Sequence, residues 1–169
     1  VEAENKVTFD YLKAIPEREA IQKRLTELWN YEKYSIPIKA GGRYFFTKND
    51  GLQNQSVVYT IDKLDGAERV LLDPNQWSKD GTVALSGMAF SDDGKYLACG
   101  VAEAGSDWQT WKVLDVATAK PLADEVKWVK YSGTAWTPDG KGFFYSRYPE
   151  PKPGEEFQKL TFNMMLCYH

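Results

Sequence analysis

A twelve-residue segment occurs twice in this sequence, and this repeat constrains the fold more than any other feature. Residues 87–98 read Gly-Met-Ala-Phe-Ser-Asp-Asp-Gly-Lys-Tyr-Leu-Ala, and residues 133–144 follow the same pattern 46 positions later. A fainter copy begins at residues 41–46. Repeats of roughly 40–50 residues built from short strands are typical of the blades of a β-propeller.

Short apolar runs separated by Asp-Gly pairs make up most of the chain after residue 34. The runs include residues 57–61, 96–99 and 143–145, and aromatic side chains are frequent in them. Aromatic side chains pack well on a pleated sheet. The Asp-Gly pairs lie at positions 50–51, 65–66, 80–81, 93–94 and 139–140. Asp-Gly favours tight hairpins because Gly adopts positive φ freely and Asp tolerates it. The pattern therefore predicts a mainly β fold and argues against a parallel α/β sheet.

The repeat has a physical explanation as one blade. The strand before the turn buries Phe90 or Trp136, and the strand after it buries residues 96–97 or 143–144 between neighbouring blades. A blade covers its apolar faces only by stacking on another blade. The first two to three four-stranded blades over residues 35–169 cannot close a ring, which typically needs about four to eight. We therefore expect a partial β-propeller, blades 1–3, that is completed by more chain or by a second chain.

The first part of the chain, residues 1–34, has a helical rather than a strand-like period. Pro16 interrupts this period, and proline is tolerated in the first turn of a helix. Four apolar residues after Pro16 are spaced to form one stripe on one helix face: Ile21, Leu25, Leu28 and Trp29. The sequence predicts an α-helical lead-in of two helices divided near Pro16.

The last stretch, Gly154 to His169, alternates in part between apolar and polar residues. Its apolar members fall partly at period two: Phe157, Leu160, Phe162, Met164, Leu166 and Tyr168. This spacing favours a strand.

The composition argues against several kinds of partner. The net charge is −3 and the Lys and Arg residues are scattered, whereas nucleic-acid binding needs a basic face. No apolar run approaches the roughly 20 residues of a membrane-spanning helix. Cys99 and Cys167 are far apart and are predicted to be unpaired thiols, with Cys99 inside a strand. One His and two distant Cys give no metal-ligand spacing, so we expect no nucleic acid, membrane, metal or cofactor.

The residues of a hydrolytic site are missing from the sequence. The single histidine, His169, is the last residue, and a chain end seldom holds an imidazole firmly. No G-x-S-x-G nucleophile elbow and no phosphate-binding glycine loop occur. Ser86, Ser106 and Ser132 lie at strand or loop positions of the repeat, where turn chemistry explains them. The chain by itself is therefore predicted to be catalytically inactive.

Several longer strings resemble one family of peptidases. They are residues 51–59 (Gly-Leu-Gln-Asn-Gln-Ser-Val-Val-Tyr), 72–75 (Leu-Asp-Pro-Asn), 80–85 (Asp-Gly-Thr-Val-Ala-Leu), 105–108 (Gly-Ser-Asp-Trp) and 129–137. Residues 1–6 and 28–34 add to the likeness, which covers essentially the whole chain. In this order and spacing the sequence resembles the N-terminal part of the prolyl oligopeptidase (prolyl endopeptidase) family.

This resemblance implies a function that the residues alone do not. Members of the family are serine endopeptidases that cleave short peptides after proline, with an α/β-hydrolase domain capped by a seven-bladed propeller. The chain would supply the first blades, and the catalytic Ser, Asp and His would come from the later part of the protein. Expected partners are proline-containing short peptides and the α/β-hydrolase domain of the same protein. The propeller would control substrate access, and the expected location is cytoplasmic, with periplasmic as the alternative.

Two residues are candidates for substrate binding by the same resemblance. Tyr131 matches a position at which the family carries an aromatic residue, usually Phe, in the pocket for the residue two before the proline. The alternative is that Tyr131 belongs to the blade core. Asp107 lies in a loop that in the family faces the hydrolase domain near the peptide, and the alternative is a turn-capping role. Trp108 beside it is expected to pack at an interface.

A second function remains open at this stage. The chain could be a non-catalytic propeller segment that serves protein interaction by assembling with another chain. The sequence begins at Val1 without an initiating Met, so we expect that the natural start has been removed.

Overall fold

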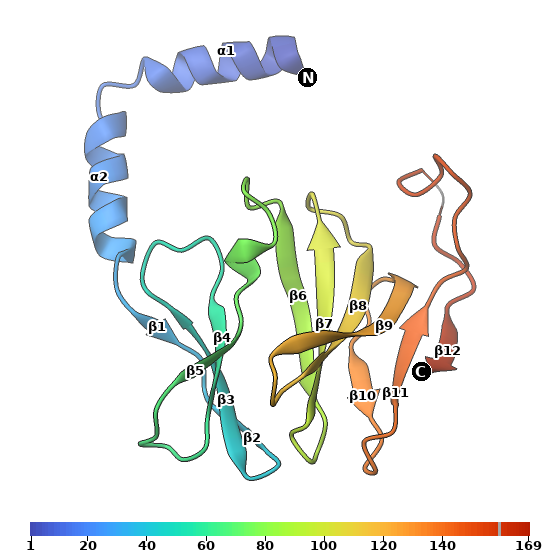
Figure 1. The fold of residues 1–169 in the computed structure, drawn as a ribbon. Helices are drawn as coiled ribbons and strands as arrows, with labels where there is room; N and C mark the ends of the chain where they lie inside the picture. The colour runs from blue at the N-terminus through green and yellow to red at the C-terminus, as the bar shows by residue number, and fades with distance from the viewer. Residues whose placement is uncertain (159) are drawn as a thin grey trace.

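The structure is a computed structural model that describes residues 1–158 and 160–169 (Figure 1). Two α-helices come first, followed by strands and one short 3-10 helix. The helices are α1 (Glu2–Lys13) and α2 (Arg18–Trp29), and the 3-10 helix is η1 (Pro74–Gln76). The strands are β1 (Lys33–Tyr34), β2 (Ile38–Ala40), β3 (Arg43–Asn49), β4 (Val57–Ile61), β5 (Arg69–Leu72), β6 (Val83–Phe90), β7 (Tyr96–Glu103), β8 (Gln109–Asp115), β9 (Lys120–Val129), β10 (Thr134–Trp136), β11 (Phe143–Arg147) and β12 (Met165–Tyr168).

The strands form three antiparallel sheets that stand side by side (Figure 1). Blade 1 has the order β1-β3-β4-β5. The short strands β1 and β2 both pair with β3, so together they form one interrupted edge strand. Blade 2 has the order β6-β7-β8-β9, and blade 3 has the order β10-β11-β12. From β2 onward, each strand pairs with the next one in the same sheet, as expected for up-and-down propeller blades. The predicted mainly β fold is confirmed.

Two layers of side chains make up most of the core, one at each boundary between blades. The first layer joins Phe45, Val58 and Leu71 of blade 1 to Leu97, Cys99, Leu114 and Val116 around blade 2. The second joins Ala98, Trp111, Val113, Val126 and Val129 of blade 2 to Phe143 and Tyr145 of blade 3. Alternate residues of a strand point to opposite faces of the sheet. Blade 2 therefore contributes to both layers, which is how stacked sheets share a core.

The Asp-Gly pairs of the repeat close hairpins, as the sequence predicted. In blade 2 the Ser91 hydroxyl donates to Asp93 Oδ1 at 2.7 Å, and the Lys95 N–H donates to the same oxygen at 3.1 Å. Gly94 has φ +67 and sits against the backbone of Ala40 in blade 1. Only glycine fits this position without strain, because the backbone is left-handed and a Cβ would overlap the neighbouring strand.

The Gly-Leu-Gln-Asn-Gln string ties blade 1 to blade 2 through one side chain. The Gln55 side chain donates through Nε2 to the Val83 carbonyl at 2.7 Å, and its Oε1 accepts from the Leu85 N–H at 2.8 Å. Asn75 holds the Gln55 backbone on both sides, accepting at 3.0 Å and donating at 2.9 Å. The amide of Gln55 thus acts as an extra peptide group at the edge of β6. This explains why a polar residue is needed inside the propeller.

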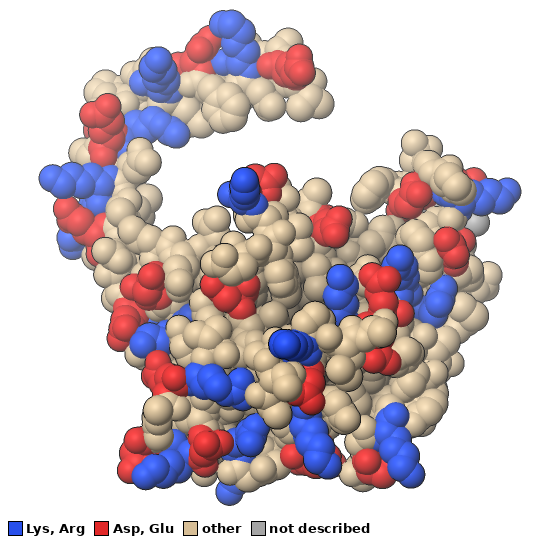
Figure 2. Space-filling view, in the orientation of Figure 1, with Lys and Arg blue, Asp and Glu red and all other residues tan. Residues whose placement is uncertain are grey.

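The two helices form an arm that stands away from the sheets (Figure 1). Neither α1 nor α2 buries a residue, although the predicted division near Pro16 is confirmed. The charged side chains lie mostly on the outer side of the arm, and the side facing the sheets is mostly uncharged (Figure 2). The helical prediction over residues 1–34 was too long, because Lys33 and Tyr34 pair with β3 as strand β1. Among the described residues, no helix is long and apolar enough to cross a membrane.

Two other sequence predictions need correction. Phe144, expected between blades, leaves 46% of its surface exposed because none of the described strands forms a further sheet on that face of blade 3. Of the residues that the structure describes between Gly154 and His169, only Met165–Tyr168 form a strand, which pairs with β11. Phe157 and Phe162 lie in the long β11–β12 loop, where their alternation has no sheet to follow, and Lys159 lies outside the described residues.

Candidate functional site

The loops of the blades gather at two opposite edges of the sheets (Figure 1). The hairpin edge carries the turns between β2 and β3, β4 and β5, β6 and β7, β8 and β9, and β10 and β11. The arm-side edge carries the connections β3–β4, β5–β6, β7–β8, β9–β10 and β11–β12, and the helical arm rises from this same edge. Binding residues concentrate on loops that a rigid scaffold holds, and the two longest connections between strands, β5–β6 and β11–β12, lie at the arm-side edge, so this edge is the candidate site.

Tyr131 and Asp107, which the sequence placed 24 residues apart, meet at the arm-side edge. The Tyr131 hydroxyl donates to Asp107 Oδ2 at 2.8 Å. Tyr131 is 73% exposed, so the alternative that it belongs to the blade core is wrong. Its backbone is in the left-handed region at φ +52, which is uncommon for a residue with a side chain and is found often at functional sites. The hydrogen bond to the Asp107 carboxylate, followed by its charge, raises the pKa of Tyr131.

Asp107 is not the residue that caps its loop. The Ser106 hydroxyl accepts the Trp108 N–H at 3.1 Å and so performs the turn role. The Asp107 side chain is exposed and bonded to Tyr131 from the next loop along the edge. Its carboxylate is therefore presented to solvent at the edge, next to an aromatic ring.

A cluster of aromatic rings forms around Trp108, the residue that follows Asp107. Trp108 makes edge-to-face contacts with Trp128 at 5.7 Å and with Tyr148 at 6.2 Å between ring centroids. The Lys130 ammonium lies 4.1 Å from the Trp108 ring centroid, within cation–π range. The Trp108 indole donates to the Glu156 carbonyl at 2.7 Å and so fixes the β11–β12 loop. These contacts of Trp108 are all within the chain, and its predicted packing at an interface stays a prediction.

A cavity of about 250 Å³ opens beside this cluster. Its lining includes Trp108 and, from the β11–β12 loop, Tyr148, Pro149, Pro151 and Phe162. Sequence reasoning missed Trp128, Tyr148 and Lys130, whose only signal was the local density of aromatic residues. The positive φ of Trp128, +63, leaves no trace in the sequence because Gly and Asn are the usual residues at such angles.

The sequence and fold together identify the family. The family model for the N-terminal β-propeller domain of prolyl oligopeptidase matches residues 1–169. The chain belongs to the prolyl oligopeptidase family. The prolyl endopeptidase of Elizabethkingia meningoseptica is 43% identical over 169 residues, which are 100% of this chain and 24% of that protein.

Solved structures of prolyl oligopeptidases agree with the observed fold. A prolyl endopeptidase, solved in a study of inter-domain dynamics in catalysis and specificity, is 34% identical with a TM-score of 0.89, over 99% of this chain and 25% of that one. Prolyl oligopeptidase B of Galerina marginata, bound to a 25mer macrocyclization substrate, is 31% identical with a TM-score of 0.86, over 97% of this chain and 25% of that one. The apo form of the same enzyme has a TM-score of 0.71 at 33% identity and the same coverage.

The chain thus spans about a quarter of the length of these prolyl oligopeptidases. The family model that it matches is the propeller part, and the chain does not extend over a catalytic domain. The single histidine, His169, places Nε2 2.8 Å from Asp124 Oδ1 beside an open cavity at the hairpin edge. Among the described residues, no Ser, Thr or Cys lines that cavity, and no cluster of three or more His, Cys, Asp or Glu is placed to hold a metal.

Proposed function

We propose that this chain is the propeller part of a proline-specific serine endopeptidase that cleaves short peptides after proline. The match of the whole chain to the family's N-terminal propeller domain carries this proposal. The nucleophile, base and orienting acid come from an α/β-hydrolase domain of the same protein, and the chain alone does not hydrolyse peptides. Its role is to control which peptides reach that domain and to supply part of a binding subsite.

The arm-side edge is the surface that supports the subsite role. Tyr131 presents an exposed ring to which an apolar side chain or blocking group can pack. Asp107 holds the Tyr131 hydroxyl, so the ring keeps one orientation. We assign this pair to the pocket for the residue two before the proline.

The helical arm supports the presence of a hydrolase domain at the same edge. Large apolar side chains of α1 and α2 are more than half exposed, including Phe9, Tyr11, Leu25 and Trp29. Exposed apolar stripes of this size mark surfaces that bind another protein part. A domain placed between the arm and the arm-side edge covers them and faces Tyr131 at the same time.

The proposal is tested with the full-length protein and a chromogenic glycyl-prolyl amide. We expect turnover by the full-length protein, a large loss when the proline is replaced by alanine, and none by residues 1–169 alone. A full-length protein that is folded but inactive on this substrate favours the other function, a non-catalytic interaction segment.

The subsite assignment has its own test in the full-length protein. Tyr131→Ala is expected to raise KM about three- to tenfold for peptides with an apolar residue two before the proline, since such an aromatic contact contributes about 1 kcal/mol. Tyr131→Phe keeps the ring and is expected to lose less. Leu64→Ala changes a similarly exposed residue, 69%, in the β4–β5 turn and serves as the control. Unchanged kinetics in Tyr131→Ala would remove this residue from the subsite.

A further inference from the structure

The direction of the helical arm is not set by packing of the helices. Neither helix buries a residue, yet the arm leaves blade 1 in one direction (Figure 1). What fixes it is the short segment from Trp29 to Tyr34, which contacts β3, the β3–β4 loop and Glu68. We call this segment with its contacts the arm joint.

Lys33 fixes the first half of the arm joint. Its ammonium donates to the Gly51 carbonyl at 2.7 Å. The same ammonium lies 5.0 Å from the centroids of both the Trp29 and Tyr31 rings. Cation–π contact of this kind is electrostatic and directional. One lysine thus holds the last residue of α2, the following aromatic residue and the loop of blade 1 together.

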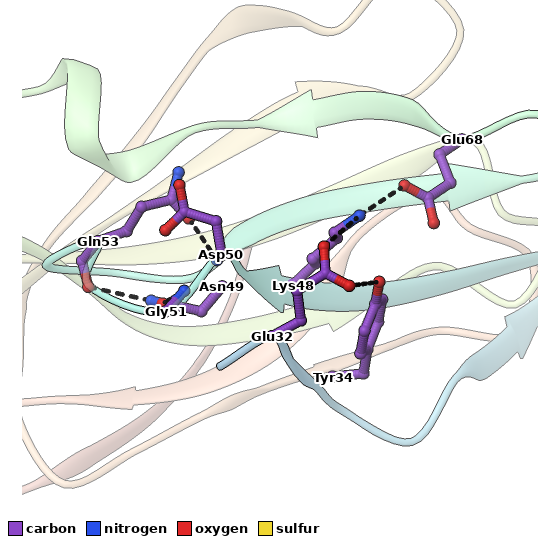
Figure 3. A network of polar contacts seen from close by, with 8 residues as sticks. All are labelled: Glu32, Tyr34, Lys48, Asn49, Asp50, Gly51, Gln53 and Glu68. Carbon is purple, nitrogen blue, oxygen red and sulfur yellow. Dashed lines mark hydrogen bonds and ion pairs between the residues drawn. The ribbon is translucent and has the colours of Figure 1, made fainter. Parts of the chain in front are cut away.

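Lys48 fixes the second half, and it reaches both sides of the joint (Figure 3). From β3 its ammonium lies 3.4 Å from Glu32 Oε1 and 3.5 Å from Glu68 Oε2. The Tyr34 hydroxyl donates to the other Glu32 oxygen at 3.0 Å. The hydrogen bond with Tyr34 and the two carboxylates raise the pKa of Lys48.

The loop that receives Lys33 is itself fixed. The Gly51 N–H donates to Asn49 Oδ1 at 2.9 Å, and the Asn49 amide donates to the Gln53 carbonyl at 3.0 Å (Figure 3). A Cβ at Gly51 would overlap the Asn30 side chain. Glycine here, at φ +135, lets the end of α2 approach the loop closely. The acceptor of Lys33 is thus a rigid part of blade 1.

We propose that Lys33 and Lys48 are positioning residues that set the angle between the helical arm and blade 1 through a charge-based joint. This rests on the proposed function, because the arm transmits that angle to the hydrolase domain docked on it. The joint is polar and partly exposed, so it can turn without opening the core of blade 1. It therefore controls how the propeller and the hydrolase domain meet while the blades stay rigid.

The test measures the distance between the arm and blade 1 in the full-length protein. Spin labels are placed at Gln22 in α2 and at Asp65 in the β4–β5 turn, both of which are exposed. Pulsed electron paramagnetic resonance then measures the distance between the two labels. We expect a narrow distribution in the parent and a broader one in Lys33→Met and Lys48→Met. High salt is expected to broaden the distance distribution of the parent toward that of the variants, because salt screens exposed charges. It is expected to change the distributions of the variants little.

Matched variants separate positioning from folding. Lys63→Met removes one positive charge from the same blade. Lys63 pairs with Asp65, and the two side chains are 73% and 83% exposed. Because Asp65 is the usual label site, this variant carries its second spin label at Asn54 instead. It should leave the distribution narrow. Glu68→Gln removes the charge of the acceptor while keeping its shape, and it is expected to reproduce part of the Lys48→Met effect if Lys48→Met proves unstable.

The kinetic readout follows the same variants. Hinge residues usually change kcat and KM together, so Lys48→Met is expected to change kcat/KM for the prolyl amide about three- to tenfold, and Lys63→Met less than about twofold. Parent-like distance distributions in Lys33→Met, Lys48→Met and Glu68→Gln would overturn the proposal. The distance measurement needs no substrate, so a full-length protein without prolyl peptidase activity contradicts the proposed function and still decides the joint.

Discussion

Blades 2 and 3 carry the same repeat and bury it differently. In blade 2, Leu97 is fully buried against blade 1, and the next residue, Ala98, is fully buried against blade 3. The matching residues of blade 3 are Phe143, which is 1% exposed against blade 2, and Phe144, which is 46% exposed. Since successive residues point to opposite faces, the difference reports which faces have a neighbouring sheet.

The comparison teaches that the repeat encodes the strand and the turn, while burial depends on the neighbour. The two hairpins agree closely: Gly94 and Gly140 have φ +67 and +66. The hydroxyls of Ser91 and Thr137 both donate at 2.7 Å to the Asp of the turn. These contacts are local, so the same residues give the same geometry in both blades.

The comparison is tested most strongly by truncating the two adjacent phenylalanines of blade 3. Phe143→Ala is expected to lower the free energy of unfolding by about 3–5 kcal/mol, because it leaves a cavity between two sheets. Phe144→Ala is expected to cost less than about 1 kcal/mol in this chain, because half of the ring is already in water and its main contact is Tyr168 at 5.2 Å. Urea unfolding of both variants measures the difference between their free energies of unfolding. The comparison requires that the free energy falls with urea concentration at the same slope in both.

Equal costs for the two truncations would break the comparison. They would mean that the outer face of blade 3 is covered in solution, for example by a second copy of the chain. Repeating the urea titration at a tenfold lower protein concentration separates that case, because self-association makes the stability depend on concentration.

A smaller effect is expected from removing the Gln55 side chain, whose hydrogen bonds join blade 1 to β6 of blade 2. Gln55→Leu removes both hydrogen bonds to β6 and leaves the Val83 carbonyl and the Leu85 N–H without these partners. The expected loss is about 1 kcal/mol, because both hydrogen bonds are only partly buried and water can reach the groups that are left. Gln76→Leu is the control, since the Gln76 amide donates only to Asp73, at 3.1 Å on an exposed side. A loss no greater than in Gln76→Leu would show that the core layer alone joins the blades.

Much of the fold could be predicted because it depends on local patterns. The Asp-Gly turns, the strands between them and the two helices divided near Pro16 all follow from residues close in sequence. The register of Leu97 opposite Leu114 follows from alternation of apolar side chains. The exposure of Phe144 and the strand at Lys33–Tyr34 could not be predicted, since each depends on whether a particular neighbouring strand is present.

The candidate site was predicted less completely, for a different physical reason. Tyr131 and Asp107 were singled out by resemblance, and that they share a hydrogen bond follows from two loops meeting at one edge. The left-handed backbone at Trp128 and Tyr131 depends on tertiary packing that overrides the preference of those residue types. The arm joint was missed because Lys33 and Lys48 look like ordinary surface lysines until β1 is paired with β3.

The smallest expected effect concerns acid stability of the two hairpin turns. The Lys95 side chain, the Ser91 hydroxyl and the Lys95 N–H lower the pKa of Asp93 to about 2. The Thr137 hydroxyl and the Lys141 N–H also lower the pKa of Asp139. A carboxyl with a lowered folded pKa stabilises the fold above its unfolded pKa of about 3.9 and loses that contribution as the pH falls toward the folded value.

The parent chain should therefore lose stability between about pH 4 and pH 2 more steeply than Asp93→Asn, whose amide does not titrate. Asp139→Asn should also make the loss of stability with falling pH less steep, but by a smaller amount than Asp93→Asn. The Lys141 ammonium lies 3.6 Å from Asp139, whereas the Lys95 ammonium lies 2.8 Å from Asp93. Urea midpoints at steps of half a pH unit measure both slopes. If Asp139→Asn flattened the fall as much as Asp93→Asn, the ammonium contacts would not distinguish the two turns, and the hydroxyl and N–H bonds that the blades share would account for the acid response of both.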